Sequence, residues 1–137
     1  MSTAPVDVIR ELSRRLDGGD RTALGDLVAP DMVNHAAGPQ GADGLGLILD
    51  VIEHDLGPVA VEHHHLIADG ELVAQHLTLV GTHRASTMPL LSGVPVSGAP
   101  VHWTFIHLWR VVDGLVVEHW ATRDDVGLLA QVGAWPR

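Results

Sequence analysis

The stretch that decides the fold is His102-Trp103-Thr104-Phe105-Ile106-His107-Leu108-Trp109-Arg110, followed by Asp113-Gly114 and the run Leu115–Thr122. An Asp-Gly pair between two alternating runs is a strong signal for a β-hairpin. Alternation places four large side chains on one face of the first strand: Trp103, Phe105, His107 and Trp109. A histidine within an aromatic wall is suited to acid or base catalysis in a pocket, and a hydrogen-bonded core histidine is the alternative.

A second hairpin is predicted upstream, from Val59–Ala68 through the turn Asp69-Gly70 to Leu72–His83. Strict alternation would place His63 and His65 on the same face of its first strand. Both faces of this hairpin are mostly apolar. We therefore expect helices to cover one face of the sheet and a subunit contact or a neighbouring element to cover the other.

Three helices are predicted before the strands. Apolar residues recur at helical spacing over Val6–Leu16, over Ala23–Val28, where Pro30 sets the end, and over Leu45–Leu56 before a Gly-Pro pair. A final short helix is predicted over Val126–Gly133. The residues alone thus predict three helices, then two hairpins, and a short helix at the end.

Two loops are candidates for ligand contact. Arg84–Pro100 is rich in Pro and Gly yet apolar, which is typical of a binding loop or lid, and a loop packed in a dimer contact is the alternative. Asn34 and His35 lie where the chain enters a Gly-Pro loop. Such residues often face a ligand, although a turn-stabilising Asn is equally consistent with the pattern.

Composition narrows the function. The chain has 137 residues, which predicts a single domain over 1–137. A formal net charge of −9 opposes nucleic-acid and membrane partners, and the absence of Cys excludes a thiolate nucleophile and suits the reducing cytoplasm. Tyr is absent and all basic residues are Arg, so His, Asp and Glu remain for proton transfer.

Ten histidines make a metal site a natural alternative. No His-Glu-x-x-His or similar spacing fixes such a site, and no Gly-x-Ser-x-Gly elbow or dinucleotide fingerprint occurs, so we expect neither metal nor cofactor. The sequence favours an acid/base pocket in which His107 moves a proton and a carboxylate or a second histidine assists. Asp124 is a candidate partner, but Asp124 or Asp125 could instead cap the last helix and pair with Arg123.

Several short features occur together in the chain: Asn34-His35, Gly41, Gly81-Thr82-His83, Gly93 to Pro100, His107 with Arg110 and Asp113-Gly114, Glu118-His119-Trp120, and Asp125-Val126-Gly127-Leu128-Leu129 with Gln131 and Gly133. In this order, over roughly residues 5–133, they resemble the SnoaL-like polyketide cyclase or ester cyclase family of the nuclear-transport-factor-like superfamily.

The resemblance implies a cone-shaped, curved antiparallel sheet wrapped around about three N-terminal helices, a cystatin-like α+β barrel, with an apolar pocket and a homodimer formed through the outer sheet face. It also implies cofactor-free aldol ring closure, using a pocket histidine and an aspartate after the Trp of the return strand. His107 matches the histidine. Ala121 occupies the aspartate position and cannot carry a proton.

Other residues would have to supply the missing group. We predict catalytic roles for His107, Asp124 and His35. The predicted substrate-binding residues are Asn34, His65, His76, Trp103, Phe105, His119 and Trp120. The favoured hypothesis is a cofactor-independent cyclase, isomerase or hydrolase acting on a small, apolar, oxygenated metabolite. The alternative is a noncatalytic protein of the same fold that binds a hydrophobic small molecule, which the alanine favours.

Overall fold

The computed structural model describes residues 4–36 and 38–136. The elements, in chain order, are α1 (Pro5–Asp17), α2 (Thr22–Leu27), β1 (Val28–Asn34), α3 (Gly41–Leu56), β2 (Ala60–Asp69), β3 (Leu72–Thr82), the 3-10 helix η1 (Pro89–Leu91), β4 (Pro100–Val112), β5 (Leu115–Arg123) and α4 (Asp125–Gln131). Within the described part of the chain, no helix is both long and apolar enough to span a membrane.

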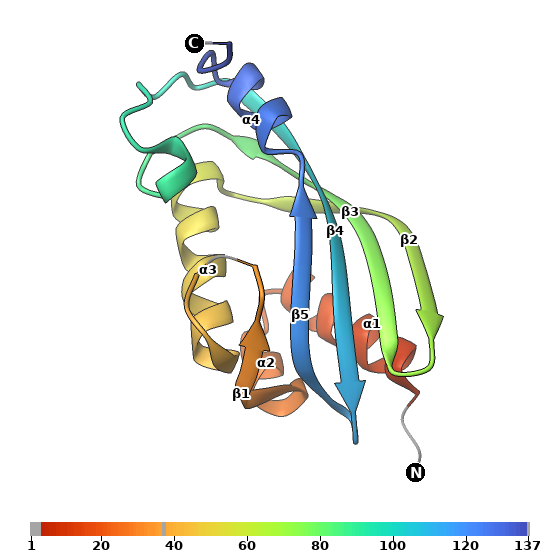
Figure 1. Ribbon diagram of the computed structural model, residues 1–137. Coiled ribbons are helices and arrows are strands. Elements are labelled where there is room, and N and C mark those ends of the chain that lie inside the picture. Colours follow the sequence, from red (N-terminus) through yellow and green to blue (C-terminus); the bar gives the residue numbers. More distant parts are fainter. Residues whose placement is uncertain (1–3, 37, 137) are drawn as a thin grey trace.

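The strands form one curved, open sheet in the order β1-β5-β4-β3-β2 (Figure 1). Both predicted hairpins are present, and β3 pairs with β4 along its whole length, from Leu72 opposite Arg110 to Thr82 opposite Pro100. The predicted cone-shaped α+β fold is confirmed. The sheet differs from the expectation in one respect, because β1 is an additional edge strand that runs parallel to β5.

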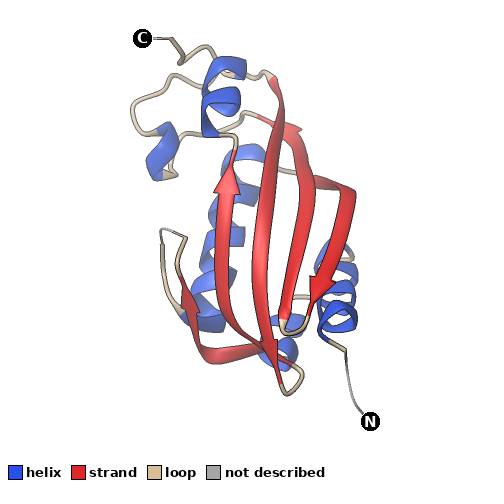
Figure 2. Cartoon of the chain, turned by 45° about the vertical axis from the view of Figure 1, so that its right-hand side comes forward, coloured by secondary structure: helices blue, strands red, loops and turns tan. Residues whose placement is uncertain are grey.

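The first three helices cover one face of the sheet, as Figure 2 shows. Their apolar side chains meet the inner-facing residues of the strands in two hydrophobic clusters. One cluster contains Trp109 with residues of α1 and α2, and the other contains Phe105 with residues of α3, η1 and α4. His107 lies between these two residues on β4, so the clusters meet at its position.

A β-bulge changes the expected facing of the histidines in β2. The register shifts between His63, opposite Leu77, and His65, opposite His76. The extra residue turns His65 to the outer face with Ile67, while His63 stays on the inner side. The prediction that His63 and His65 share a face is therefore wrong, because strict alternation does not hold across a bulge.

The connection from β3 to β4 is held by two buried polar residues. The Asp55 carboxylate, fully buried at the end of α3, accepts the backbone N–H of Met88 at 2.7 Å and that of Thr87 at 2.9 Å. Burial opposes its ionisation, but hydrogen bonds, first from Thr87, lower the pKa of Asp55 below its usual value. Buried His83 contacts Ser86 and Ser97. The lid role of this connection stays a prediction.

Candidate functional site

An aromatic stripe runs along the inner face of β4, as the sequence alternation predicts. Its members are Trp103, Phe105, His107 and Trp109. The centroid of the His107 ring lies 5.1 Å from that of Phe105 and 5.1 Å from that of Trp109. The Trp103 ring meets Phe105 edge-on at 4.6 Å and is buried. His107 is thus held between packed rings, with part of its surface still exposed.

A hydrogen-bonded chain connects His107 to β1. Nδ1 of His107 lies 2.7 Å from Nε2 of His119, and Nδ1 of His119 lies 2.9 Å from Oδ1 of Asn34. The same oxygen accepts the backbone N–H of Ala36 at 3.0 Å, which fixes the orientation of the amide. His119 therefore donates from Nδ1, and its Nε2 accepts the Nδ1–H of His107 when both rings are neutral. Nε2 is consequently the basic nitrogen of His107.

Local structure holds Asn34 in this position. Asn34 is paired with His119 in the parallel register of β1 and β5. Its backbone N–H donates to Oε1 of Gln40 at 2.8 Å, and its backbone oxygen accepts from Nε2 of Gln40 at 2.9 Å. The asparagine side chain is 5% exposed. Asn34, where the hydrogen-bonded series begins, is therefore both buried and fixed.

Burial controls the ionisation of both imidazoles. It lowers the pKa of His107 to about 3, with smaller contributions from the positive charges of His119 and Arg123. It also lowers the pKa of His119 to about 4, with a smaller contribution from His35. The cause is the loss of water around a cation in an apolar setting. At neutral pH both rings are uncharged, and His107 is fully in its basic form.

The β5 residue opposite His107 is not a carboxylate. Ala121 is directly opposite His107 in the β4–β5 register, where the resemblance implies an aspartate. Asp124 lies beyond the end of β5, is exposed, and caps α4 by accepting the Gly127 N–H at 2.9 Å. The structure therefore does not bring Asp124 to His107, because its side chain serves the helix terminus, which was the alternative reading of the sequence.

A cation shares the inner face with His107. Arg123 is paired with Phe105, and its guanidinium carbon lies 5.2 Å from the centroid of the Trp103 ring. Asp125 accepts a hydrogen bond from Arg123 at 3.1 Å and one from Trp103 Nε1 at 3.1 Å. Sequence reasoning treated Arg123 only as a surface partner of the aspartates. Its position by a π-face provides positive charge near the site.

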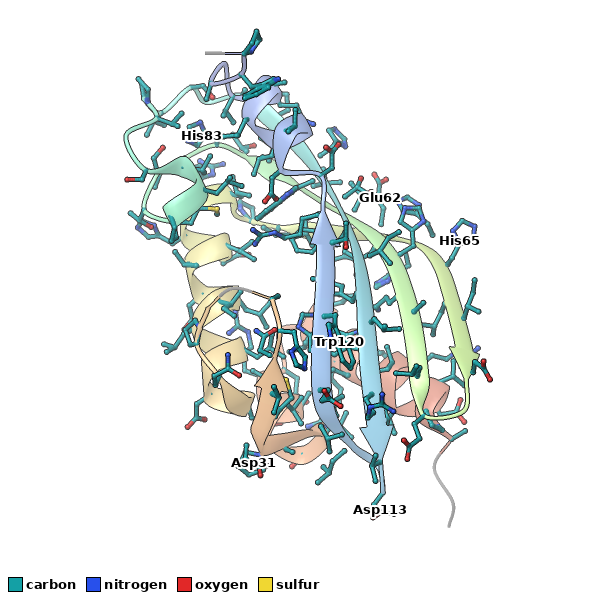
Figure 3. The ribbon with its side chains drawn as sticks, viewed as in Figure 1. Asp31, Glu62, His65, His83, Asp113 and Trp120 are labelled. Atoms are coloured by element: carbon teal, nitrogen blue, oxygen red, sulfur yellow. The ribbon has the colours of Figure 1, made fainter. Side chains whose placement is uncertain are left out.

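His35 and Trp120 belong to the outer side of the sheet. Their rings stack at 4.7 Å with an interplanar angle of 8°. Nε2 of His35 lies 2.9 Å from Glu118, whose pKa is lowered by this hydrogen bond and then by the bond from Arg110. Trp120 and Glu118 alternate with inward-facing His119, so His35 is not brought to His107. Figure 3 shows Trp120 on β5.

His65 and His76 form a pair on the same outer face. Their Nδ1 atoms are 3.0 Å apart across β2 and β3, and the ring of His64 lies 4.7 Å from that of His76. His65 is labelled at the edge of the sheet in Figure 3. The predicted grouping of His65 and His76 with His107 is therefore not observed, since the sheet separates them. Within residues 4–36 and 38–136, no group of three or more His, Asp or Glu side chains is placed to hold a metal ion.

Gln75 is a neighbour of His107 that sequence reasoning missed. It is paired with His107 in the β3–β4 register, and its Oε1 accepts from Trp109 Nε1 at 3.0 Å. Its Nε2 donates to Ser13 of α1 at 2.7 Å. The alternation of β3 indicated which face Gln75 occupies, but only the register between the two hairpins places it beside His107.

Two surface hollows are present among the described residues, and His107 lines neither of them. One, of about 590 Å³, is lined by the loop Ser92–Ser97 and by Val132–Ala134. The other, of about 450 Å³, lies between α1 and β2, where His63, His64 and His65 contribute to its wall. Gln75, which is paired with His107, also lines this second hollow, so the hollow borders the inner-face group around His107.

Comparison with known proteins now bears on this arrangement. The family model for SnoaL-like polyketide cyclases matches residues 6–132. The chain belongs to the SnoaL-like polyketide cyclase family. Among curated proteins, no sequence matches it.

Solved structures agree with this assignment. The wild-type IdmH structure from Streptomyces antibioticus, a candidate polyketide cyclase, is 31% identical, with a TM-score of 0.81 over 96% of this chain and 99% of that one. A SnoaL-like polyketide cyclase from Agrobacterium tumefaciens has a TM-score of 0.80 at 20% identity, covering 96% of this chain and 100% of that one. AclR from Streptomyces galilaeus, a candidate hydroxylase, has a TM-score of 0.80 at 23% identity, covering 97% and 87% respectively. The last two show the shared fold.

Proposed function

We propose that this SnoaL-like protein is a cofactor-independent acid/base enzyme that acts on a small, apolar, oxygenated metabolite, with His107 as the base. The observation that carries the proposal is the chain from Asn34 through His119, which makes Nε2 the basic nitrogen of His107. Family membership supports a cofactor-free, cyclase-type reaction. The aromatic neighbours supply an apolar surface for such a substrate.

The chemistry that this arrangement suits is proton transfer at carbon beside a carbonyl. Nε2 of His107 takes the proton, the C–H electron pair becomes the double bond of an enolate, and the proton returns to carbon or to oxygen after the bond rearrangement. The charge on the imidazolium is shared along the hydrogen bond to His119. Arg123, on the same inner face, can stabilise developing negative charge on the substrate.

His119 acts in this proposal as a positioning residue, because it reaches the substrate only through His107. Asn34 Oδ1 selects the tautomer of His119, and His119 in turn selects the tautomer of His107. The hydrogen bonds from Asn34 through His119 thereby orient His107, as a carboxylate does in many histidine sites. This explains how the site can operate with Ala121 opposite His107.

A second candidate is a noncatalytic protein that binds a hydrophobic ligand on the same inner face. Ala121 is the observation that favours it, because a methyl group beside His107 provides space and no proton acceptor. The two candidates differ in turnover. The noncatalytic protein, or carrier, would bind ligands without exchanging their protons.

The test is solvent-deuterium exchange at the activated carbon of 2-tetralone, followed by ¹H NMR. With the native protein, the exchange rate should exceed the rate in buffer alone. With His107→Phe, which keeps a flat ring between Phe105 and Trp109, it should equal the rate in buffer alone. His65→Phe makes the same substitution on the outer face and should exchange like the native protein. Equal exchange by native protein and His107→Phe, with 2-tetralone bound to both, would favour the carrier.

We also propose that the protein is a cytoplasmic homodimer that pairs through its outer sheet face. Ile67, 65% exposed, and Ile106, 50% exposed, lie on that face and favour burial in a contact. Sedimentation equilibrium is expected to give twice the chain mass, and Ile67→Arg should shift the mass toward that of one chain. Cell fractionation tests the compartment.

A further inference from the structure

The amide nitrogen of Asn34, Nδ2, is buried and has no hydrogen-bond partner among the described residues. The side chain is 5% exposed, and its Oδ1 is engaged twice, by His119 and by the Ala36 N–H. A buried N–H group without an acceptor is unfavourable and rare in folded proteins, and a functional role or a bound molecule is among the reasons for keeping one.

Rotating the Asn34 amide by half a turn would not give Nδ2 a hydrogen-bond partner. After such a rotation, the NH2 group would face the N–H of Ala36 and the Nδ1–H of His119. All three groups are hydrogen-bond donors, so neither contact would be a hydrogen bond. The backbone of Asn34 is also held at both its N–H and its oxygen by Gln40. The donor is therefore fixed in position before any ligand arrives, and such preorganisation favours binding.

We propose that Asn34 Nδ2–H is a substrate-reading donor that binds an acceptor oxygen of the substrate remote from the carbon where His107 acts. This inference rests on the proposed function for the identity of the reacting carbon. The imidazole rings of His119 and His107 separate the amide from Nε2 of His107. An oxygen bound at Asn34 therefore belongs to a part of the substrate remote from the reacting carbon.

The proposal defines a class of substrate. Its molecules carry a C–H group activated by a carbonyl at one end and a carbonyl, ether or hydroxyl oxygen at the far side of a rigid, largely apolar framework. The amide would then have two separate roles, since Oδ1 orients the histidines and Nδ2 recognises the substrate.

The test uses two probes of equal shape, 6-methoxy-2-tetralone and 6-ethyl-2-tetralone, which differ by an ether oxygen in place of a CH2 group. Dissociation constants come from tryptophan fluorescence, and deuterium exchange at C1 gives kcat/KM. For the native protein, both the dissociation constants and kcat/KM should favour the methoxy probe by about threefold to tenfold, the range for one hydrogen bond. In Asn34→Asp, which keeps the acceptor for His119 and lacks the N–H donor, the preference should fall to about one.

The ratio of the two probes isolates the donor, because any change in the base affects both probes alike. Gln131→Glu is the matched control, since it makes the same amide-to-carboxylate change at an exposed residue of α4 and should retain the preference. A native ratio of one, an unchanged ratio in Asn34→Asp, or no binding of either probe would overturn the inference. Binding with the predicted ratios but no exchange would uphold the inference while refuting His107 as a base.

Discussion

Acid sensitivity of folding provides a quantitative test of the buried histidine pair. The folded-state pKa of His119 is about 4, below the usual value of about 6.5 that holds for an unfolded chain. Between these values the unfolded chain binds a proton that the folded protein does not. Stability contributed by the neutral ring is therefore present above about pH 6.5 and is lost as the pH falls toward 4.

The magnitude follows from the shift. Linkage gives about 1.4 kcal/mol per pH unit within the window, so lowering the pH from 7 to 4.5 should cost roughly 2 kcal/mol through His119. His119→Gln removes this ionisation but retains a side chain that can donate to Asn34 and accept from His107. The variant should lose about 2 kcal/mol less than the native protein on acidification.

The assay is urea unfolding at pH 7 and pH 4.5, followed by tryptophan fluorescence and compared as the double difference in unfolding free energy. His65→Gln, the same substitution at an exposed histidine outside the buried pair, is the matched control and should behave like the native protein. Equal acid losses for native protein and His119→Gln would show that the His119 ring is not held neutral by burial.

Three further outcomes are expected. If His107 is the base, exchange of 2-tetralone should be independent of pH between about 5 and 8, because its pKa near 3 keeps it deprotonated there; a rise in rate through pH 6 to 7 would point to another base. Asp55→Ala should lower the unfolding free energy by about 3 kcal/mol or more, measured in urea, because it leaves the N–H groups of Thr87 and Met88 buried without an acceptor; a loss under 1 kcal/mol would contradict this anchoring. Asp124→Ala should cost about 1 kcal/mol through the lost helix cap and leave exchange unchanged, whereas a strong loss of exchange in a folded variant would restore its catalytic role.

The fold was largely predictable because its signals are local. The Asp69-Gly70 and Asp113-Gly114 turns fix two hairpins, and Gly57-Pro58 ends α3 where expected. The edge strand β1 was missed because Pro30 lies within it and its partner, β5, is distant in sequence. A parallel partner leaves no turn signature between two strands.

The candidate site was predictable only in part. Alternation places His107 in the aromatic stripe, but it could not show that His119, rather than His65 or His76, is its partner. That choice depends on the register of β4 with β5 and on the bulge after His63. The contact between His119 and Asn34 depends on a parallel pairing, so no pattern within either strand reveals it.

The tautomeric state of His107 shows whether the hydrogen bonds from Asn34 through His119 set its basic nitrogen, and it can be read from the ¹⁵N chemical shifts of the two ring nitrogens by NMR at neutral pH. The hydrogen-bonded chain predicts a neutral ring with the proton on Nδ1 and an unprotonated Nε2. Asn34→Ala should broaden or shift this pattern by releasing His119. A proton on Nε2, or a charged ring at pH 7, would contradict the account.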